Sequence, residues 1–133
     1  LTGSGGAIFS VLPSPCMRSD EALLLDILIA ARRVQSFMGQ RRREELAEDY
    51  QLQFAVQKGI EIIGEAAGSL SETIKAELAS VPWRDIIGMR HRLVHDYSRI
   101  NLEVVWEVVE RDIPALVTAI EPYISHLEAD SAP

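Results

Sequence analysis

The chain is poor in cysteine, in aromatic residues and in long apolar runs, and each shortage excludes a class of protein. Cys16 is the single cysteine, so neither a disulfide within the chain nor a zinc site built from cysteines can form. That usage suits a reducing cytoplasm. Aromatic residues make up 6% of the chain, and no apolar run approaches the ~20 residues that cross a bilayer. We therefore expect a cytoplasmic protein with no membrane contact.

What remains is the composition of one soluble globular domain. The 133 residues are 47% hydrophobic and 25% charged, which is ordinary for such a domain. Ala, Leu, Ile, Val and Glu dominate and favour helix. The formal net charge is −7, so the surface as a whole should repel nucleic acid. Any contact with nucleic acid must therefore come from a local patch.

The first 16 residues differ from the rest because they carry no charge and are rich in Gly, Ser and Pro. We interpret residues 1–16 as a tag remnant or disordered leader, with Met17 as the natural start. Cys16 then falls in the leader and has no expected role. Residues 17–128 form the expected helical domain, and residues 129–133 an expected frayed tail.

Apolar residues recur at helical spacing through the whole domain, and no segment alternates as a strand does. We therefore predict an all-α, up-and-down bundle of four to five helices without a sheet. Gly59 and Gly64 are expected to mark close helix contacts, and Pro114 to kink or interrupt the last helix. The arginine run 41–43 is read as a solvated turn. The expected helices are 19–39, 44–68, 71–78, 82 up to a break at 98–101, and 102 to about 127.

Residues 83–101 stand out as a locally basic segment in an acidic chain. Four arginines against two aspartates within this segment give 4 − 2 = +2 before any histidine is counted. Such a reversal of sign marks a candidate anion site, although arginines on a helix can equally pair with acidic neighbours. The residues concerned are Arg84, Asp85, Arg90, His91, Arg92, His95, Asp96, Tyr97 and Arg99.

These residue types suit the cleavage of RNA. His95 can take the proton of the 2′-hydroxyl group near neutral pH, and Arg90 can hold the phosphate and its developing charge. DNA lacks that hydroxyl and would be spared. On one straight helix, however, Arg90 and His95 lie roughly 140° apart. The site therefore needs either a bent helix end or a second copy of the chain.

Two other interpretations stay open at this point. His91 and His95 have the spacing of a helical two-histidine metal site, but Arg92 stands where the metalloprotease signature has Glu. Alternatively, His95 and Tyr97 pack the helix end while the arginines pair with acids. On residue types alone, this purely structural role is the more frequent outcome.

The segment also carries a motif of a known family. Residues 83–90 read WRDIIGMR and residues 93–97 read LVHDY, and Arg90, His95 and Tyr97 match the signature R-x-x-x-x-H-x-Y. Residues 62–67 (IIGEAA) and 105–107 (VWE) match further. From Met17 to about Ile124 the chain thus resembles the HepT-like family of HEPN-domain toxins.

The resemblance implies a homodimeric helical bundle in which two copies of the motif share a cleft. It implies metal-independent RNA cleavage by Arg90 and His95, with no cofactor. It also implies a minimal nucleotidyltransferase antitoxin as partner, which can transfer AMP to Tyr97. Added phosphate charge beside Arg90 would occupy the anion site.

His91 stands where many relatives have Asn, and it is a candidate supporting residue together with Tyr97. Which of His91 and His95 acts as base or acid stays open. The alternative to a toxin enzyme is a catalytically silent HEPN module. Such a module would bind a nucleotide or a nucleotidyltransferase without cutting RNA.

Overall fold

The structure is a computed structural model that describes the backbone of residues 19–96 and 99–131. Side chains are described for these residues except 90, 91, 94–96, 99 and 126–131. The expected leader, Met17 and Tyr97 therefore lie outside the described residues. The elements in chain order are α2 (Asp20–Met38), α3 (Arg43–Glu48), α4 (Tyr50–Gly68), α5 (Glu72–Glu77), α6 (Trp83–Leu93), β1 (Val94–Asp96), β2 (Arg99–Ile100), α7 (Leu102–Glu107), the π-helical turn η2 (Val108–Asp112) and α8 (Ile113–Ser131).

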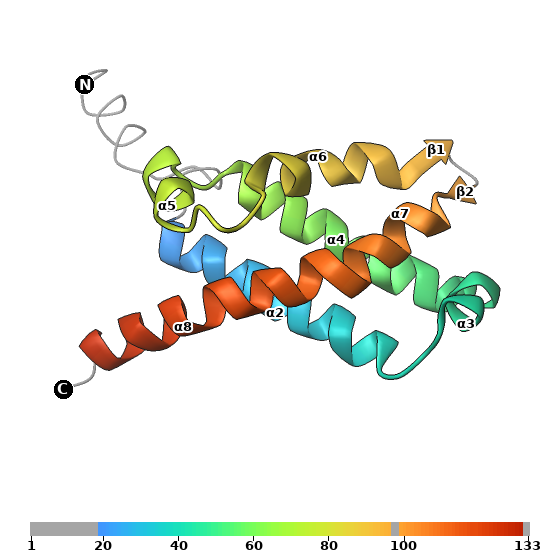
Figure 1. Ribbon diagram of the computed structural model, residues 1–133, viewed down its shortest axis with the longest axis horizontal. Helices are drawn as coiled ribbons and strands as arrows, with labels where there is room; N and C mark the ends of the chain where they lie inside the picture. Colours follow the sequence, from blue (N-terminus) through green and yellow to red (C-terminus); the bar gives the residue numbers. More distant parts are fainter. Residues whose placement is uncertain (1–18, 97–98, 132–133) are drawn as a thin grey trace, which may run out of the picture.

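Four long helical segments run up and down alongside each other: α2, α4, α6 and the rod made of α7, η2 and α8 (Figure 1). The short helices α3 and α5 lie at opposite ends of this bundle, and β1 and β2 lie at the end occupied by α3. The predicted all-α bundle is confirmed. In the described part of the chain, no helix is long and apolar enough to cross a membrane.

The first helix begins and ends where the local signals predict. The Ser19 side chain accepts a hydrogen bond from the amide of Ala22 at 3.2 Å, which satisfies one of the free N–H groups at the start of α2. Gly39 ends the helix with a φ of 53°, a left-handed value that favours glycine. Asp20 also accepts hydrogen bonds from the amide and hydroxyl of Ser71, and so ties the start of α2 to that of α5.

The single helix expected over 44–68 is wrong, because the chain forms α3 and α4 with a break at Asp49. The Asp49 carboxylate accepts a hydrogen bond from the amide of Leu52 at 3.0 Å and thereby caps α4. Gln53 is buried, and its side chain donates to the carbonyl oxygens of Leu46 and Ala47 at the end of α3. These bonds satisfy the last carbonyl groups of α3 and fix its turn onto α4.

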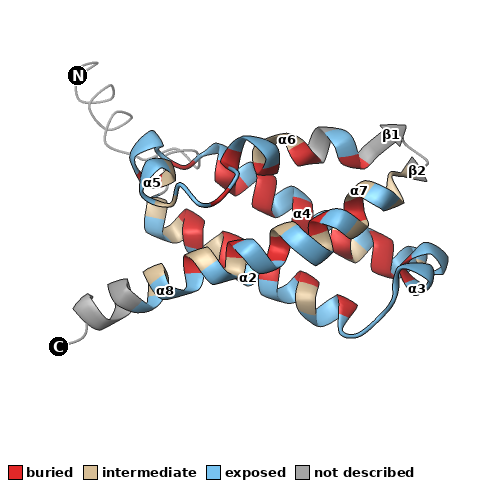
Figure 2. Ribbon diagram, viewed as in Figure 1, coloured by how far each residue is buried: buried red, intermediate tan, exposed pale blue. Residues whose placement is uncertain are grey.

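The core lies where the four long segments face one another, and buried residues follow the inward side of each helix (Figure 2). Gly59 of α4 lies against Val34 of α2, and a Cβ placed on Gly59 would come closer than 3.0 Å to Cγ2 of Val34. A side chain here would force Val34 or the two helices to shift, so Gly59 marks a close approach of α2 and α4, as predicted. The largest fully buried side chains are Leu24, Ile27, Val34, Leu46, Ile60, Ile63, Ile86, Met89, Leu93, Ile113, Leu116 and Ile120.

The expected absence of a sheet is wrong in one place, because β1 and β2 form a short antiparallel ladder. Val94 pairs with Ile100 and Asp96 with Arg99, with an irregular register between the two pairs. The ladder is too short for an alternating pattern to reveal it in the sequence. It also means that α6 ends at Leu93 rather than at the expected break at 98–101.

The last helix is interrupted ahead of Pro114, as predicted. Pro114 has no N–H to donate and its ring conflicts with the carbonyl group one turn back. Just before Pro114 the helix takes the wider π-helical form of η2, in which the amide of Ile113 donates a hydrogen bond to the carbonyl oxygen of Val108. Beyond the proline, α8 continues to Ser131, past residue 128, where we placed the end of the domain.

Candidate functional site

The structure places the motif residues at the junction between α6 and α7. Arg90 and His91 belong to the last turn of α6, and His95 is the middle residue of β1. For these three residues the backbone alone is described, and Tyr97 lies outside the described residues. Arg90 and His95 therefore lie on two different elements, at one end of the bundle (Figure 1).

Two hydrogen bonds at the base of the hairpin explain why the helix ends here. The amide of Asn101 donates to the carbonyl oxygen of Leu93 at 2.7 Å, and so joins the residue before β1 to the residue after β2. The Asn101 side chain then accepts from the amide of Val104 at 3.3 Å and caps α7. Leu93 is buried and Ile100 packs against the core. The hairpin is thus anchored on both sides by apolar contacts.

The end of α6 at Leu93 resolves part of the geometric difficulty raised by the sequence. The 140° divergence between Arg90 and His95 assumed one continuous helix. Because the chain leaves the helix before His95, that angle does not apply, and the bent helix end is the alternative that the backbone realises. The same break removes the helical spacing that the metal interpretation of His91 and His95 requires.

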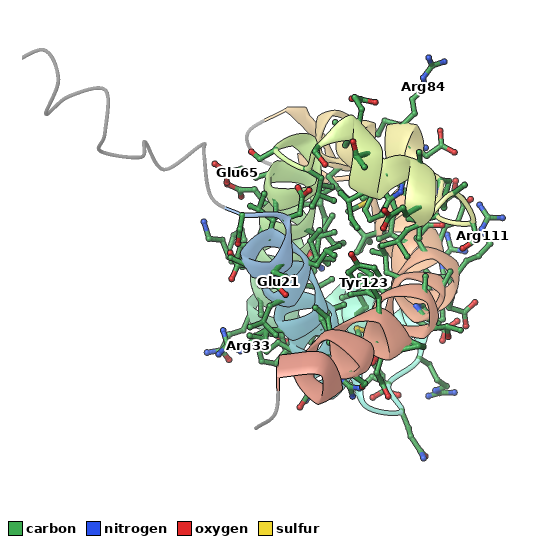
Figure 3. The ribbon with its side chains drawn as sticks, turned by 90° about the vertical axis from the view of Figure 1, so that its left-hand side faces the viewer. Glu21, Arg33, Glu65, Arg84, Arg111 and Tyr123 are labelled. Atoms are coloured by element: carbon green, nitrogen blue, oxygen red, sulfur yellow. The ribbon has the colours of Figure 1, made fainter. Side chains whose placement is uncertain are left out.

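The two arginines of the basic segment whose side chains are described, Arg84 and Arg92, do not face the same patch. Ile87 lies next to Gly68 of α4, and position 90 follows Ile87 by three residues on the same side of the helix. Arg92 instead lies on the side of α6 that faces α7 and η2. Arg84 is exposed and points away from the bundle (Figure 3). Position 90 is thus the arginine position on the α4 side of α6.

A polar depression of about 140 Å³ lies between α6 and the α7–η2 segment. Arg111 forms an ion pair with Glu107, and its Nε is 3.8 Å from Oδ1 of Asp112. Burial raises the pKa of Asp112, while the nearby Arg111 and Arg92 oppose that rise. The residues that line the depression are Asp85, Arg92, Val104, Glu107, Val108, Arg111 and Asp112.

The sequence analysis did not single out this cluster of charges. The spacing of Glu107 and Arg111, four residues apart, is a readable signal for an ion pair on one helix. Asp112 has no such signal, because its burial depends on how η2 packs against α6. Three carboxylates against two guanidinium groups give no excess of positive charge. The depression is therefore poorly suited to a phosphate, and we leave it outside the candidate site.

The arginine run 41–43 at the tip of the bundle is exposed to solvent, as predicted, and each arginine also pairs with an acid. Arg41 pairs with Asp49 at 2.9 Å and Arg43 pairs with Glu103 at 3.3 Å. Arg42 pairs with a glutamate of α3 in the same way. The amide of Leu52, with Arg41 as a further cause, holds the pKa of Asp49 below its usual range. These ion pairs link the arginines to α3, to the start of α4 and to α7, and because they are solvent-exposed each contributes little stability.

Among the side chains that the structure describes, which leave out those of His91, His95 and Asp96, no group of three or more His, Cys, Asp or Glu is arranged to hold a metal ion. In the described backbone, α6 carries the Arg90 position in its last turn, and β1 follows at once with the His95 position. An arginine and a histidine can together bind a phosphodiester and move its protons.

Comparison with known proteins identifies the family of the chain. The model of the family described as ribonuclease HepT-like matches residues 27–123. A protein of Methanocaldococcus jannaschii, named provisionally as an RNase, is 31% identical over 104 residues, which are 78% of this chain and 95% of that protein. A protein of Thermococcus cleftensis, named provisionally as ribonuclease HepT, is 35% identical over 99 residues, or 74% of this chain and 90% of that protein. No solved structure matches the chain. The chain therefore belongs to the ribonuclease HepT-like family.

Proposed function

We propose that this chain is a metal-independent endoribonuclease, the toxin of a toxin–antitoxin pair, with Arg90 and His95 as its catalytic residues. The observation that carries the proposal is an R-x-x-x-x-H-x-Y motif at the exit of α6, in a chain that belongs to the ribonuclease HepT-like family. The names given to its relatives point to the same class of substrate.

The mechanism follows from the chemistry of RNA. His95 takes the proton of the 2′-hydroxyl group, and the freed oxygen attacks the neighbouring phosphorus. Arg90 holds the phosphate oxygens and balances the negative charge that grows on them. The bond from phosphorus to the 5′-oxygen then breaks, and that oxygen takes up a proton. His91 is the candidate acid for this last transfer, or it exchanges roles with His95. The products are a 2′,3′-cyclic phosphate and a 5′-hydroxyl end.

The end of α6 before His95 supports this assignment. Because His95 lies on β1, it can approach a phosphate held at position 90 from a direction that a residue in the next turn of α6 could not. We propose in addition that the chain acts as a homodimer, so that two motif segments share one cleft. A second copy would screen the reacting phosphate from water. This screening would strengthen the interaction of the phosphate with the Arg90 residue of each copy.

The test is cleavage of a labelled single-stranded RNA in the presence of EDTA. We expect His95→Ala to lose at least about 100-fold in rate, the typical contribution of one acid or base. Arg90→Ala should lose a similar factor through the lost charge stabilisation. His126→Ala is the matched control, because His126 lies in α8 outside the motif. Full activity of His95→Ala, with its helical circular dichroism intact, would remove His95 from the mechanism. Inactivity of the native chain on every RNA tried would favour the silent module.

We propose further that a nucleotidyltransferase partner neutralises the chain by modifying Tyr97. In that step the tyrosine oxygen attacks the α-phosphorus of ATP, and pyrophosphate leaves. The added phosphate would place negative charge near Arg90 and fill the site for the RNA phosphate. Mass spectrometry after incubation with the partner and ATP should show one AMP adduct on the peptide that contains Tyr97. An adduct on Tyr50 or Tyr123 instead would contradict the proposal.

A further inference from the structure

His95 lies at an irregular position in the ladder between β1 and β2. Val94 of β1 pairs with Ile100 of β2. The next pair joins Asp96 with Arg99, so one residue of β1 and no residue of β2 lies between the two pairs. This count is that of a β-bulge, in which the extra residue has no partner on the opposite strand and its own strand bends. The extra residue here is His95.

The ladder by itself is too weak to hold this bulge in place. In a regular ladder each residue lies opposite a partner on the neighbouring strand, and successive residues face opposite sides of the sheet. A bulged residue has no such partner. In addition, β1 has three residues and β2 has two, and an isolated two-stranded hairpin is at best marginally stable in water. The position of β1 is therefore set at the base of the hairpin.

Asn101 lies at that base and joins three elements through three hydrogen bonds, which we call the Asn101 clamp. Its amide donates to the carbonyl oxygen of Leu93, the last residue of α6, at 2.7 Å. Its side-chain oxygen accepts from the amide of Val104 at 3.3 Å. Its carbonyl oxygen accepts from the amide of Val105 at 3.0 Å. The clamp thus ties the end of α6 and the end of β2 to the first turn of α7.

Both sides of the Asn101 clamp are fixed in the core. Leu93 is 1% exposed, and Val105 is fully buried. His95 follows Leu93 by only two residues, so the clamp sets where β1 begins. Position 90 is instead held by the helical backbone of α6. A loosened clamp would therefore move His95 relative to position 90.

We propose that Asn101 is a positioning residue for His95. It holds the base of β1, so that the proton-transfer group stays within hydrogen-bond reach of the 2′-hydroxyl group. This role rests on the proposed function, in which His95 takes that proton, and Asn101 acts only through His95. A cap with a purely structural role would stabilise α7 and leave the rate of cleavage unchanged.

The test is a graded series at position 101, measured as kcat and KM for cleavage of labelled RNA in the presence of EDTA. Asn101→Asp keeps the capping oxygen and the N–H group, so kcat should stay close to the native value. Asn101→Ala loses the capping oxygen, and kcat should fall about 5-fold, the factor by which a typical cap shifts an equilibrium. Asn101→Pro loses the N–H group as well, and kcat should fall about 100-fold, as for a misplacement of about 1 Å.

The backbone at position 101 accepts proline, so the third variant is informative. The φ of Asn101 is −85°, within about 20° of the value that the proline ring imposes. Ile100 lies in a strand, the conformation that a residue before proline favours. In all three variants KM should stay within about twofold of the native value, because Arg90 holds the phosphate from α6.

Ser19→Ala is the matched control, because it removes a cap of the same kind at the other end of the bundle. The Ser19 side chain accepts from the amide of Ala22 at the start of α2, away from β1 and β2 (Figure 1). Ser19→Ala should lower the Tm about as much as Asn101→Ala does and leave kcat unchanged. In a His95→Ala background, Asn101→Ala should slow cleavage no further, because no proton-transfer group is left to position.

The Asn101 clamp can also be followed by NMR without RNA. In Asn101→Ala the amide of residue 101 should exchange its hydrogen about 5-fold faster, because the base of the hairpin opens more often. The imidazole signals of His95 should shift in the same variant. Both measurements should match the native chain in Ser19→Ala.

Unchanged kcat in Asn101→Pro overturns the proposal, and so does a kcat in Ser19→Ala as low as in Asn101→Ala. A further loss from Asn101→Ala in the His95→Ala background would show that Asn101 does not act through His95, and would also overturn it. If the native chain cleaves no RNA, the proposed function fails, and the NMR signals of His95 decide separately. Unshifted signals in Asn101→Ala would then show that Asn101 does not position His95.

Discussion

The contact between Gly59 and Val34 predicts opposite effects for the same mutation at two glycines. Gly59 lies inside α4 against α2, where an added Cβ would collide with Cγ2 of Val34. Gly88 lies inside α6, where an added Cβ would meet nothing within 4 Å. Neither residue has a positive φ, so alanine fits the backbone at both positions. The two substitutions therefore differ in packing and in little else.

The expected magnitudes follow from that comparison. Alanine in a helix interior stabilises by about 0.5–1 kcal/mol relative to glycine, and this gain applies to both sites. Overpacking a core costs about 1–3 kcal/mol, and Val34 is fully buried and stiff at χ1. Gly88→Ala should thus stabilise, while Gly59→Ala should fall about 2 kcal/mol below it. For a domain of this size that difference is about 6–8 °C in Tm.

The assay is thermal and urea unfolding followed by far-ultraviolet circular dichroism, at one protein concentration because self-association raises apparent stability. Val34→Ala completes a double-mutant cycle. Without Cγ2 of Val34 the collision disappears, so Gly59→Ala should stabilise in that background, with a coupling of about 1–3 kcal/mol. Equal effects of the two alanines in the native background would refute the reasoning, since they would show that α2 and α4 separate without cost.

Two further predictions concern the helix junction and the charged depression. Asn101→Ala should destabilise the chain by about 1 kcal/mol through loss of the α7 cap, whereas Asn101→Asp should keep most of the stability; equal losses in urea unfolding would contradict the role of the cap. Burial raises the pKa of Asp112 above its ordinary value of 3.8, so the folded chain binds a proton more tightly and loses stability as pH rises from about 3.8 through the raised pKa. Asp112→Asn removes this dependence, and its stability relative to the native chain should increase with pH across that window. A difference that stays constant with pH would argue against a raised pKa.

Local signals were sufficient to locate many helix ends. Ser19 and Gly39 bound α2 as expected, and Ser71 begins α5 by accepting a hydrogen bond from the amide of Ile74. Each of these interactions involves residues a few positions apart, so it can be recognised without knowledge of the fold. The family motif was readable for the same reason, since it is a fixed spacing within eight residues.

Features that depend on distant contacts could not be read in this way. The break at Asp49 is held by the buried side chain of Gln53, which bonds back to α3. The early end of α6 depends on a bond from Asn101 to Leu93 across the hairpin. In both places the local pattern allows the helix to continue. The break is favourable because it gives hydrogen-bond partners to polar groups that the fold buries.

The sequence by itself therefore determined the all-α class, the helical periods and the residue types of the candidate site. The tertiary structure decided how that site is divided, with position 90 on α6 and His95 on β1. It also decided which of the described arginines pair with acids, because partners such as Asp49 and Glu103 lie outside the arginine run itself. The physical reason is range: helix propensity and caps act over one turn, whereas burial and charge pairing join residues that the fold alone brings together.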